Sequence, residues 1–325
     1  MNRVIIVIVG LLLLCGLMSV AVIDVHAAGS YTFTPIDVPF TGGHDTSAYG
    51  INITSHIVGD YIDSDGYYHG FLYDGSAYTA IDVPFAGSYD TSAYSINSAG
   101  VIVGSYYDAD DYVHGFMYDG VTYTTLDVTF SGSFDTRAYG INNSGYIVGD
   151  YKDDDGYHGF MYNGTTYATI DVPFPDSYDT SAYNINDAGI IVGDYLDVDA
   201  YLHGFLYDGT TYTTLDVPFA GSYDTSAYGI NNAGAIVGKY YDADDFIHGF
   251  LYDGAAYASI DVPFPGSYDT RAIGINGAGT IVGDYIDDDG YHGFVAVVPE
   301  PISSTLFIAG ATVLGFRIFR KKPIA

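Results

Sequence analysis

The sequence predicts an all-β protein, a six-bladed β-propeller with four strands in each blade. The tripeptide His-Gly-Phe recurs six times at intervals of 44 or 45 residues, and each interval contains four short segments rich in β-branched and aromatic residues. A repeat of this length is typical of propellers, solenoids and other arrays, and four strands per repeat favour propeller blades. The repeated histidines are His69, His114, His158, His203, His248 and His292.

The unit that begins at Thr225 shows the four expected strands, at residues 225–231, 235–241, 246–252 and 257–264. Short runs of Asn, Asp and Gly separate the segments and supply the positive φ angles of tight hairpins. The two 44-residue intervals each lack one residue between an acidic loop and the histidine, while every other register is kept. Such a deletion predicts a solvent-exposed loop at that point.

The two ends of the repeat region predict a closed ring. The last unit stops at residue 298 without a fourth strand, whereas an extra strand, residues 31–40, precedes the first unit. We expect this N-terminal strand to complete the sixth blade, which removes the exposed edges that invite aggregation. A β-helix or other solenoid is the alternative, although hairpin turns imply antiparallel pairing whereas solenoid rungs are parallel.

The N-terminus resembles a secretory signal peptide covering residues 1–27. Arg3 precedes an apolar run from Val4 to about Ile23, and the small residue Ala27 ends the segment at the expected cleavage site. A retained anchor helix is the alternative, because the apolar run is long enough to span a bilayer. The chain's one cysteine lies inside this segment, so the exported protein contains no disulfide.

The C-terminus, residues 298–325, has three parts. Pro299, Glu300 and Pro301 are followed by an apolar stretch at 302–319 that Arg317 interrupts. The basic end consists of Arg320, Lys321 and Lys322. A helix of this length can cross a membrane, and the basic cluster would stay cytoplasmic, so the body faces outward. An ordinary C-terminal anchor is the alternative.

This tail resembles the PEP-CTERM sorting signal of bacteria that make extracellular polysaccharide. In that family an exosortase, a membrane enzyme similar to a transpeptidase, recognises the Pro-Glu-Pro site and releases or transfers the protein. The resemblance covers residues 298–322 and implies an exosortase as processing partner. It further implies a location at the cell surface, in the extracellular matrix or in a biofilm, where polysaccharide is a candidate partner.

The repeats resemble the HAF family of bacterial extracellular repeats, over residues 31–298. Its pattern is an Ile-Asn-x-x-Gly-x-x-Val-Gly segment followed by a His-x-Phe-Leu segment. Here these segments appear as Ile96-Asn97, Gly100 and Val103-Gly104 with His114-Gly115-Phe116. The resemblance implies an exported repeat protein and no established catalytic residue. The first copy has residues 53–56, Ile-Thr-Ser-His, where glycine is usual, so we expect a looser turn there.

The charge of the body excludes some partners. Of the chain's 40 acidic side chains, all but Asp24 lie between residues 28 and 301, together with four of its nine basic ones. The resulting net charge of about −35 repels nucleic acid and anionic lipid and attracts cations.

The acidic loops before the histidines are candidate Ca²⁺ sites. Two or three carboxylates within four residues can supply the oxygen ligands of a weak extracellular site. The alternative is that these residues only form solubilising turns. The candidate ligands are Asp63, Asp65, Asp108, Asp110, Asp153, Asp155, Asp197, Asp199, Asp242, Asp244, Asp287 and Asp289.

Two further repeated residues are predicted to be structural. The six histidines are one to a blade, so they do not converge on a zinc ion, and we expect each imidazole to bond a neighbouring turn. The Asp of Ile-Asp-Val-Pro-Phe is expected to link one blade to the next by accepting backbone N–H bonds. Its copies are Asp37, Asp82, Asp127, Asp171, Asp216 and Asp261.

The symmetry of the repeats disfavours an enzyme. An active site normally breaks repeat symmetry, and the unrepeated residues here form no recognisable acid, base or nucleophile set. They are His44, His56, Arg137, Lys152, Lys239 and Arg271. The sequence therefore favours a non-enzymatic surface or matrix protein whose 35 tyrosines include candidate sugar-stacking platforms. The alternatives are Ca²⁺-dependent adhesion or self-association and, less favoured, a secreted hydrolase or lyase.

Overall fold

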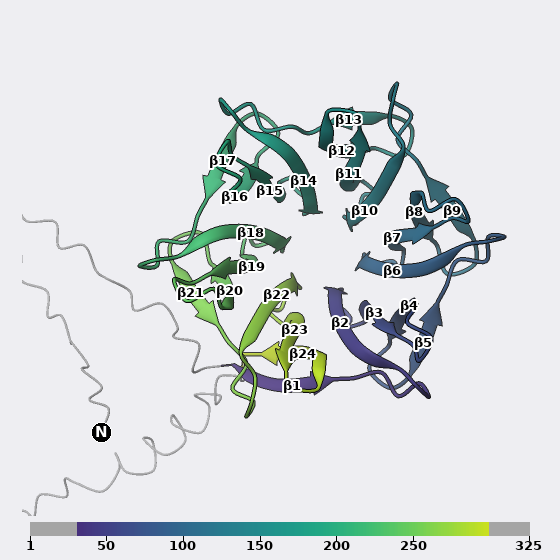
Figure 1. Cartoon of the computed structure of the whole chain (residues 1–325), viewed down its shortest axis with the longest axis horizontal. Coiled ribbons are helices and arrows are strands. Elements are labelled where there is room, and N and C mark those ends of the chain that lie inside the picture. Colours follow the sequence, from purple (N-terminus) through teal and green to yellow (C-terminus); the bar gives the residue numbers. More distant parts are fainter. Residues whose placement is uncertain (1–30, 299–325) are drawn as a thin grey trace, which may run out of the picture.

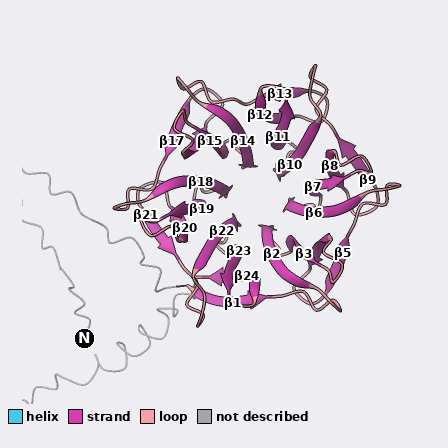
Figure 2. Ribbon diagram, viewed as in Figure 1, coloured by secondary structure: helices cyan, strands magenta, loops and turns pink. Residues whose placement is uncertain are grey.

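The protein is an all-β propeller of six four-stranded antiparallel blades around a central axis (Figure 1). The computed structural model describes residues 31–298, so the predicted signal peptide and sorting tail lie outside the described residues. Strands and loops make up this part of the chain (Figure 2), and it contains no helix long and apolar enough to cross a membrane. The predicted fold class is confirmed.

The first five blades follow one another along the chain, each running from an inner strand beside the axis to an outer strand. Blade 1 consists of β2 (His44–Ile51), β3 (Ile57–Ile62), β4 (Tyr68–Tyr73) and β5 (Tyr78–Ile81). Blade 2 consists of β6 (Tyr89–Ile96), β7 (Ile102–Tyr107), β8 (Val113–Tyr118) and β9 (Tyr123–Leu126). Blade 3 consists of β10 (Asp135–Ile141), β11 (Ile147–Asp153), β12 (Gly156–Tyr162) and β13 (Tyr167–Thr169).

The second half of the ring repeats this arrangement. Blade 4 consists of β14 (Tyr178–Ile185), β15 (Ile191–Leu196), β16 (Leu202–Tyr207) and β17 (Tyr212–Leu215). Blade 5 consists of β18 (Tyr223–Ile230), β19 (Ile236–Tyr241), β20 (Ile247–Tyr252) and β21 (Tyr257–Ile260). Blade 6 consists of β22 (Asp269–Ile275), β23 (Ile281–Asp287), β24 (Gly290–Val297) and, from the other end of the chain, β1 (Thr32–Ile36).

The strand β1 closes the ring, as the sequence predicts. It pairs antiparallel with β24 from Thr32 opposite Val297 to Ile36 opposite Gly293, and the two strands lie side by side at the outer edge of blade 6 (Figure 1). The side chains Phe33 and Phe294 meet at 5.8 Å between ring centroids. Closure therefore combines a hydrogen-bonded ladder with aromatic packing between segments about 260 residues apart in sequence.

The hydrophobic core lies between neighbouring blades, and the His-Gly-Phe motif contributes to it. The phenylalanine of each motif is fully buried: Phe71, Phe116, Phe160, Phe205, Phe250 and Phe294. The glycine before it allows close approach of the next strand, because a Cβ on Gly70 would lie 2.6 Å from the carbonyl oxygen of Ile81. The motif therefore recurs because packing requires these two residue types in every blade.

Two loop predictions have different outcomes. The shortened loops are exposed at their tips, residues 154–155 and 288–289, as predicted. The first Asn turn is not looser than the others, because Ser55 adopts a positive φ of 63° and donates its N–H to Asn52 just as Gly100 does to Asn97. The prediction of a looser turn is wrong, since serine accepts the left-handed conformation that glycine provides elsewhere.

Candidate functional site

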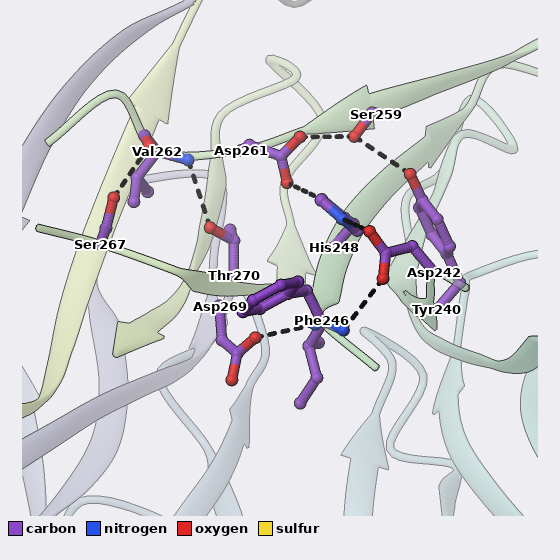
Figure 3. A network of polar contacts seen from close by, with 11 residues as sticks. Tyr240, Asp242, Phe246, His248, Ser259, Asp261, Val262, Ser267, Asp269 and Thr270 are labelled. Carbon is purple, nitrogen blue, oxygen red and sulfur yellow. Dashed lines mark hydrogen bonds and ion pairs between the residues drawn. The ribbon is translucent and has the colours of Figure 1, made fainter. Parts of the chain in front are cut away.

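Each repeated histidine lies between two aspartates of its own blade. In blade 5, His248 contacts Asp261 through Nδ1 at 2.9 Å and the loop residue Asp242 through Nε2 at 3.1 Å (Figure 3). The ring of Tyr240 stacks on the imidazole with 5.3 Å between centroids. Burial lowers the pKa of His248, but the two carboxylates raise it by more, so the net shift is upward. The same arrangement recurs in all six blades, and the imidazole in each contacts the neighbouring acidic loop.

The repeated Asp of Ile-Asp-Val-Pro-Phe does not link blades. Its carboxylate faces the histidine Nδ1 of its own blade, and the backbone N–H that Asp171 accepts, from Gly159, also belongs to the same blade. The prediction of an inter-blade link through this residue is wrong. In blade 3 the imidazole of His158 and the N–H of Gly159 engage both carboxylate oxygens of Asp171 within the blade.

A different aspartate links the blades, and it is not among the residues predicted from the sequence. The Asp of the Asp-Thr pair that begins each inner strand accepts a backbone N–H from the preceding blade, as Asp90 does from Tyr68 at 2.8 Å. The pair Asp45 and Tyr291 makes the same bond from blade 6 to blade 1. The following threonine also accepts an inter-blade bond, from Val83 N–H to Thr91 Oγ1 at 3.4 Å. The presence of Asp-Thr in every unit is the signal that could have identified this role.

Clefts with aromatic walls and a few polar side chains lie between blades on the side of the histidines. The cleft between blades 1 and 2 has a volume of about 270 Å³, and an equivalent cleft of about 250 Å³ lies between blades 4 and 5. In the first cleft Tyr67, which is half exposed, meets Tyr89 edge to face at 6.2 Å. His69, Asp82 and Asp90 supply the polar groups of the wall.

The second cleft reproduces the first closely. Tyr201 and Tyr223 again meet edge to face, at 6.4 Å, beside His203, Asp216 and Asp224. The tyrosine from the next blade is fixed in each cleft, because its hydroxyl donates to a loop aspartate at 2.5 Å, Asp111 for Tyr89 and Asp245 for Tyr223. This hydrogen bond raises the pKa of both tyrosines to about 12. Each cleft is therefore a preformed aromatic corner with carboxylates and an imidazole beside it.

Two cavities lie in succession along the axis. A ring of six asparagines surrounds the first, of about 340 Å³. Each side-chain amide donates to the backbone carbonyl of the next asparagine at 3.1 to 3.3 Å, and the last bond returns to the first residue. The ring consists of Asn52, Asn97, Asn142, Asn186, Asn231 and Asn276.

The second axial cavity, of about 210 Å³, is lined by five tyrosines, one from each of the first five blades, and by Arg271 and Ile273 of blade 6. Neighbouring tyrosine rings contact one another with centroids 5.0 to 5.5 Å apart. The five are Tyr49, Tyr94, Tyr139, Tyr183 and Tyr228.

Buried carboxyl groups lie next to these tyrosines. Burial raises the pKa of Asp60 and of Asp194 to about 7, although Ser92 donates a hydrogen bond to Asp60 at 2.6 Å. Asp284 is instead held by Arg271, which donates to it through two nitrogens at 2.7 and 2.6 Å.

The structure brings some of the unrepeated residues together. Arg137 lies 3.6 Å from Asp150 beside the tyrosine ring, and Arg271 and Lys239 lie on the opposite side of it. Lys152 contacts the rings of Phe134 and Tyr157, away from the axis. His44 is the first residue of β2, and His56 lies in the turn directly before β3. These residues stand out in the sequence because they are unrepeated, but the sequence alone does not show that three of them lie beside the tyrosine ring.

The first aspartate of each acidic loop is occupied by its own turn. Asp63 Oδ1 accepts the N–H groups of Asp65 and Tyr67, and its Oδ2 contacts His69. The N–H of Tyr67 is the main reason that the pKa of Asp63 lies below its usual range. Within residues 31–298 no group of three or more His, Cys, Asp or Glu side chains could hold a metal ion. The Ca²⁺ site stays a prediction that rests on the second aspartate of each loop.

Comparison with known proteins supports the fold. No protein-family model matches the chain, and no curated protein sequence matches it. Among solved structures, the SapL1 lectin in complex with α-methyl fucoside is similar at 15% identity and a TM-score of 0.51, covering 80% of this chain and 97% of the lectin. The Aleuria aurantia lectin, described as a six-bladed β-propeller with a fucose recognition mode, is 12% identical, with a TM-score of 0.46 and coverage of 85% and 98%.

A sialidase propeller is similar to the same extent. The Trypanosoma rangeli sialidase, in complex with 2,3-difluorosialic acid, is 8% identical with a TM-score of 0.50, covering 86% of this chain and 60% of the sialidase. At these identities the similarity defines a class, the propellers, and carries no residue from one protein to the other.

Proposed function

We propose that this protein is an exported, non-enzymatic carbohydrate-binding propeller of the cell surface or extracellular matrix. The observation that carries the proposal is the pair of equivalent clefts, between blades 1 and 2 and between blades 4 and 5, each with an aromatic corner. A sugar ring presents an apolar face that stacks on tyrosine and hydroxyls that donate hydrogen bonds to carboxylates. The clefts offer both kinds of contact side by side.

The shape and charge of the clefts favour neutral sugars. Each cleft is lined by three carboxylates and by no lysine or arginine, so an anionic ligand would be repelled. Each is small enough to hold one or two sugar rings, which predicts weak single sites. Two equivalent sites on one rigid ring strengthen the hold on a polymer through avidity. The structural similarity to lectins is consistent with this proposal but does not carry it.

The binding test uses the full-length chain purified in mild detergent and a panel of neutral oligosaccharides. We expect saturable binding without metal, with two equivalent sites per chain by isothermal titration calorimetry. The double variant Tyr67→Ser/Tyr201→Ser removes one aromatic wall from each cleft and should abolish binding. The control is Tyr112→Ser, which removes a tyrosine of the same exposure and loop position from the neighbouring blade. Equal loss of binding in the control would overturn the assignment of the clefts.

We also propose that an exosortase sorts the protein to the surface through its C-terminal tail. The proposal is supported by the order of three features in the sequence: Pro299, Glu300 and Pro301 come first, an apolar stretch follows, and a basic end comes last. Replacing these three residues by alanine in the producing organism should leave the tail uncut, as measured by the mass of the mature chain. Identical C-termini in the wild type and the variant would reject the sorting proposal and leave the binding proposal unaffected.

The competing enzyme hypothesis is open to a direct check. If the chain were a propeller hydrolase, incubation with the oligosaccharides that it binds would release shorter products over time. We expect the bound oligosaccharides to be recovered intact. Product release that is lost on changing an unrepeated residue such as Arg271 would reject the non-enzymatic proposal.

A further inference from the structure

The few cations of the body gather at the axis. Four basic side chains lie within residues 31–298, and three of them, Arg137, Lys239 and Arg271, lie beside the tyrosine ring. The body has a net charge of about −35, so basic side chains would find acidic partners anywhere on its surface. Their burial beside one cavity therefore needs a reason.

Part of the reason is an exchange between neighbouring blades. A buried aspartate on the second strand of one blade normally accepts a bond from a serine on the first strand of the next, as Asp60 does from Ser92 at 2.6 Å. Blades 2 and 5 carry Ser105 and Lys239 in place of this aspartate, and the following blade then carries arginine in place of serine. Each arginine pairs with the aspartate of its own blade.

The exchange occurs twice, three blades apart, but its two copies differ. On one side Arg137 faces the neutral Ser105 and pairs with Asp150, which leaves no excess charge. On the other side Arg271 pairs with Asp284 and lies near Lys239. Burial and, to a lesser extent, Arg271 lower the pKa of Lys239, but its tyrosine neighbours raise it by more, so the net shift is upward. Among the described residues no carboxylate lies within ion-pair distance of Lys239. Burial raises the pKa of the nearby Asp194 to about 7, even though Lys239 lowers it, so the lysine charge is not neutralised by an ion pair.

The tyrosine ring is open at the same place. Blade 6 has Ile273 where the other five blades have tyrosine, and Arg271 reaches the cavity beside it. Asp284 occupies two of the five N–H donors of the Arg271 guanidinium, so three remain for another partner. The cavity thus has a cationic corner at blade 6 and aromatic walls with hydroxyl groups around the rest.

We propose that the axial tyrosine cavity is a single binding site for a hydroxylated carboxylate of about the size of a uronic acid. The carboxylate would lie against Arg271, with Lys239 behind it, and the ring would stack on the tyrosines. The volume of about 210 Å³ accommodates one such ring. This site differs from the inter-blade clefts in number, in charge and in the ligand that it selects.

The test is calorimetric titration of the full-length chain with glucuronate and, as a matched neutral ligand, glucose. We expect one glucuronate per chain and at least tenfold weaker binding of glucose. A tetrauronide tests the source of the ligand. If the cavity binds the end of this chain, the natural ligand is a polysaccharide, and if the tetrauronide does not bind, the natural ligand is a free sugar acid.

Three variants locate the site. Ile273→Tyr gives blade 6 the tyrosine that the other five blades carry, and it should abolish glucuronate binding by filling the space beside Arg271. Blade 3 shows that a tyrosine and an arginine fit together at these two positions. Lys239→Ser introduces the residue that blade 2 carries and should weaken binding at least tenfold. Tyr67→Ser in the outer cleft should leave glucuronate binding unchanged.

Equal affinities for glucose and glucuronate would overturn the proposal, and so would full glucuronate binding by Ile273→Tyr at an unchanged melting temperature. Preferential binding of the cation choline would also overturn it, because the tyrosines would then select a positive ligand. The variants at the clefts and at the axis are separate, so failure here leaves the proposed function standing.

Discussion

Replacing the buried carboxyl of Asp60 by an amide should change how the stability of the propeller depends on pH. Asp60 is 3% exposed and accepts a hydrogen bond from Ser92, and burial raises its pKa from 3.8 to about 7. Between these two pH values the folded protein holds a proton that the unfolded chain has released. Raising the pH across this interval therefore lowers the free energy of unfolding.

The size of the effect follows from the pKa difference. Each pH unit between the folded and unfolded pKa values corresponds to about 1.4 kcal/mol, so Asp60 costs about 4 kcal/mol of stability above pH 7. Asp60→Asn keeps the shape and an oxygen that accepts from Ser92, but it cannot ionise. The variant should match the wild type near pH 4 and exceed its unfolding free energy by about 4 kcal/mol at pH 8.

The assay is urea unfolding followed by tyrosine fluorescence at pH values from 4 to 8.5, since the chain has 35 tyrosines and no tryptophan. The control is Asp65→Asn, which makes the same carboxyl-to-amide change at an exposed loop position. A stability difference for Asp60→Asn that does not grow with pH would refute the reasoning.

Three further predictions concern closure, blade contacts and calcium. Deleting residues 31–37 removes β1 and the Asp37 contact to His292, so the melting temperature should fall and dimers should form at the exposed edge of β24, as seen by size-exclusion chromatography; an unchanged monomer would contradict closure by β1. Asp90→Ala should cost about 0.5 to 1.5 kcal/mol in urea unfolding, because the N–H of Tyr68 loses its hydrogen bond to the next blade, whereas Asp65→Ala should cost less. If the acidic loops bind Ca²⁺, millimolar Ca²⁺ should raise the melting temperature and Mg²⁺ should not; equal effects of the two ions would remove the calcium sites.

The fold could be predicted because its determinants are local or periodic. The interval between His-Gly-Phe motifs gives the number of blades, and the missing last strand together with the extra first strand, residues 31–40, gives the closure. The hairpin turns require a residue with a positive φ angle, which is usually glycine. Ser55 adopts such an angle in the first Asn turn, so this turn depends less strictly on glycine than the sequence predicts.

The site could be predicted only in part, because its contacts join different blades. The link from Asp90 to Tyr68 spans 22 residues and uses a residue type that also forms ordinary turns, so its role is not visible in one unit. The exchange that pairs Arg271 with Asp284 and places it beside Lys239 becomes intelligible only when the neighbouring strands are known. Unrepeated residues were correctly singled out, but their convergence depends on the closed ring.

The most direct test of the carbohydrate-binding proposal is a crystal structure of the protein with the neutral oligosaccharide that it binds most tightly. The proposal predicts a sugar ring stacked in the corner of Tyr67 and Tyr89 and a second one in the corner of Tyr201 and Tyr223. Sugar bound elsewhere on the ring, with both corners empty at saturating ligand, would contradict it.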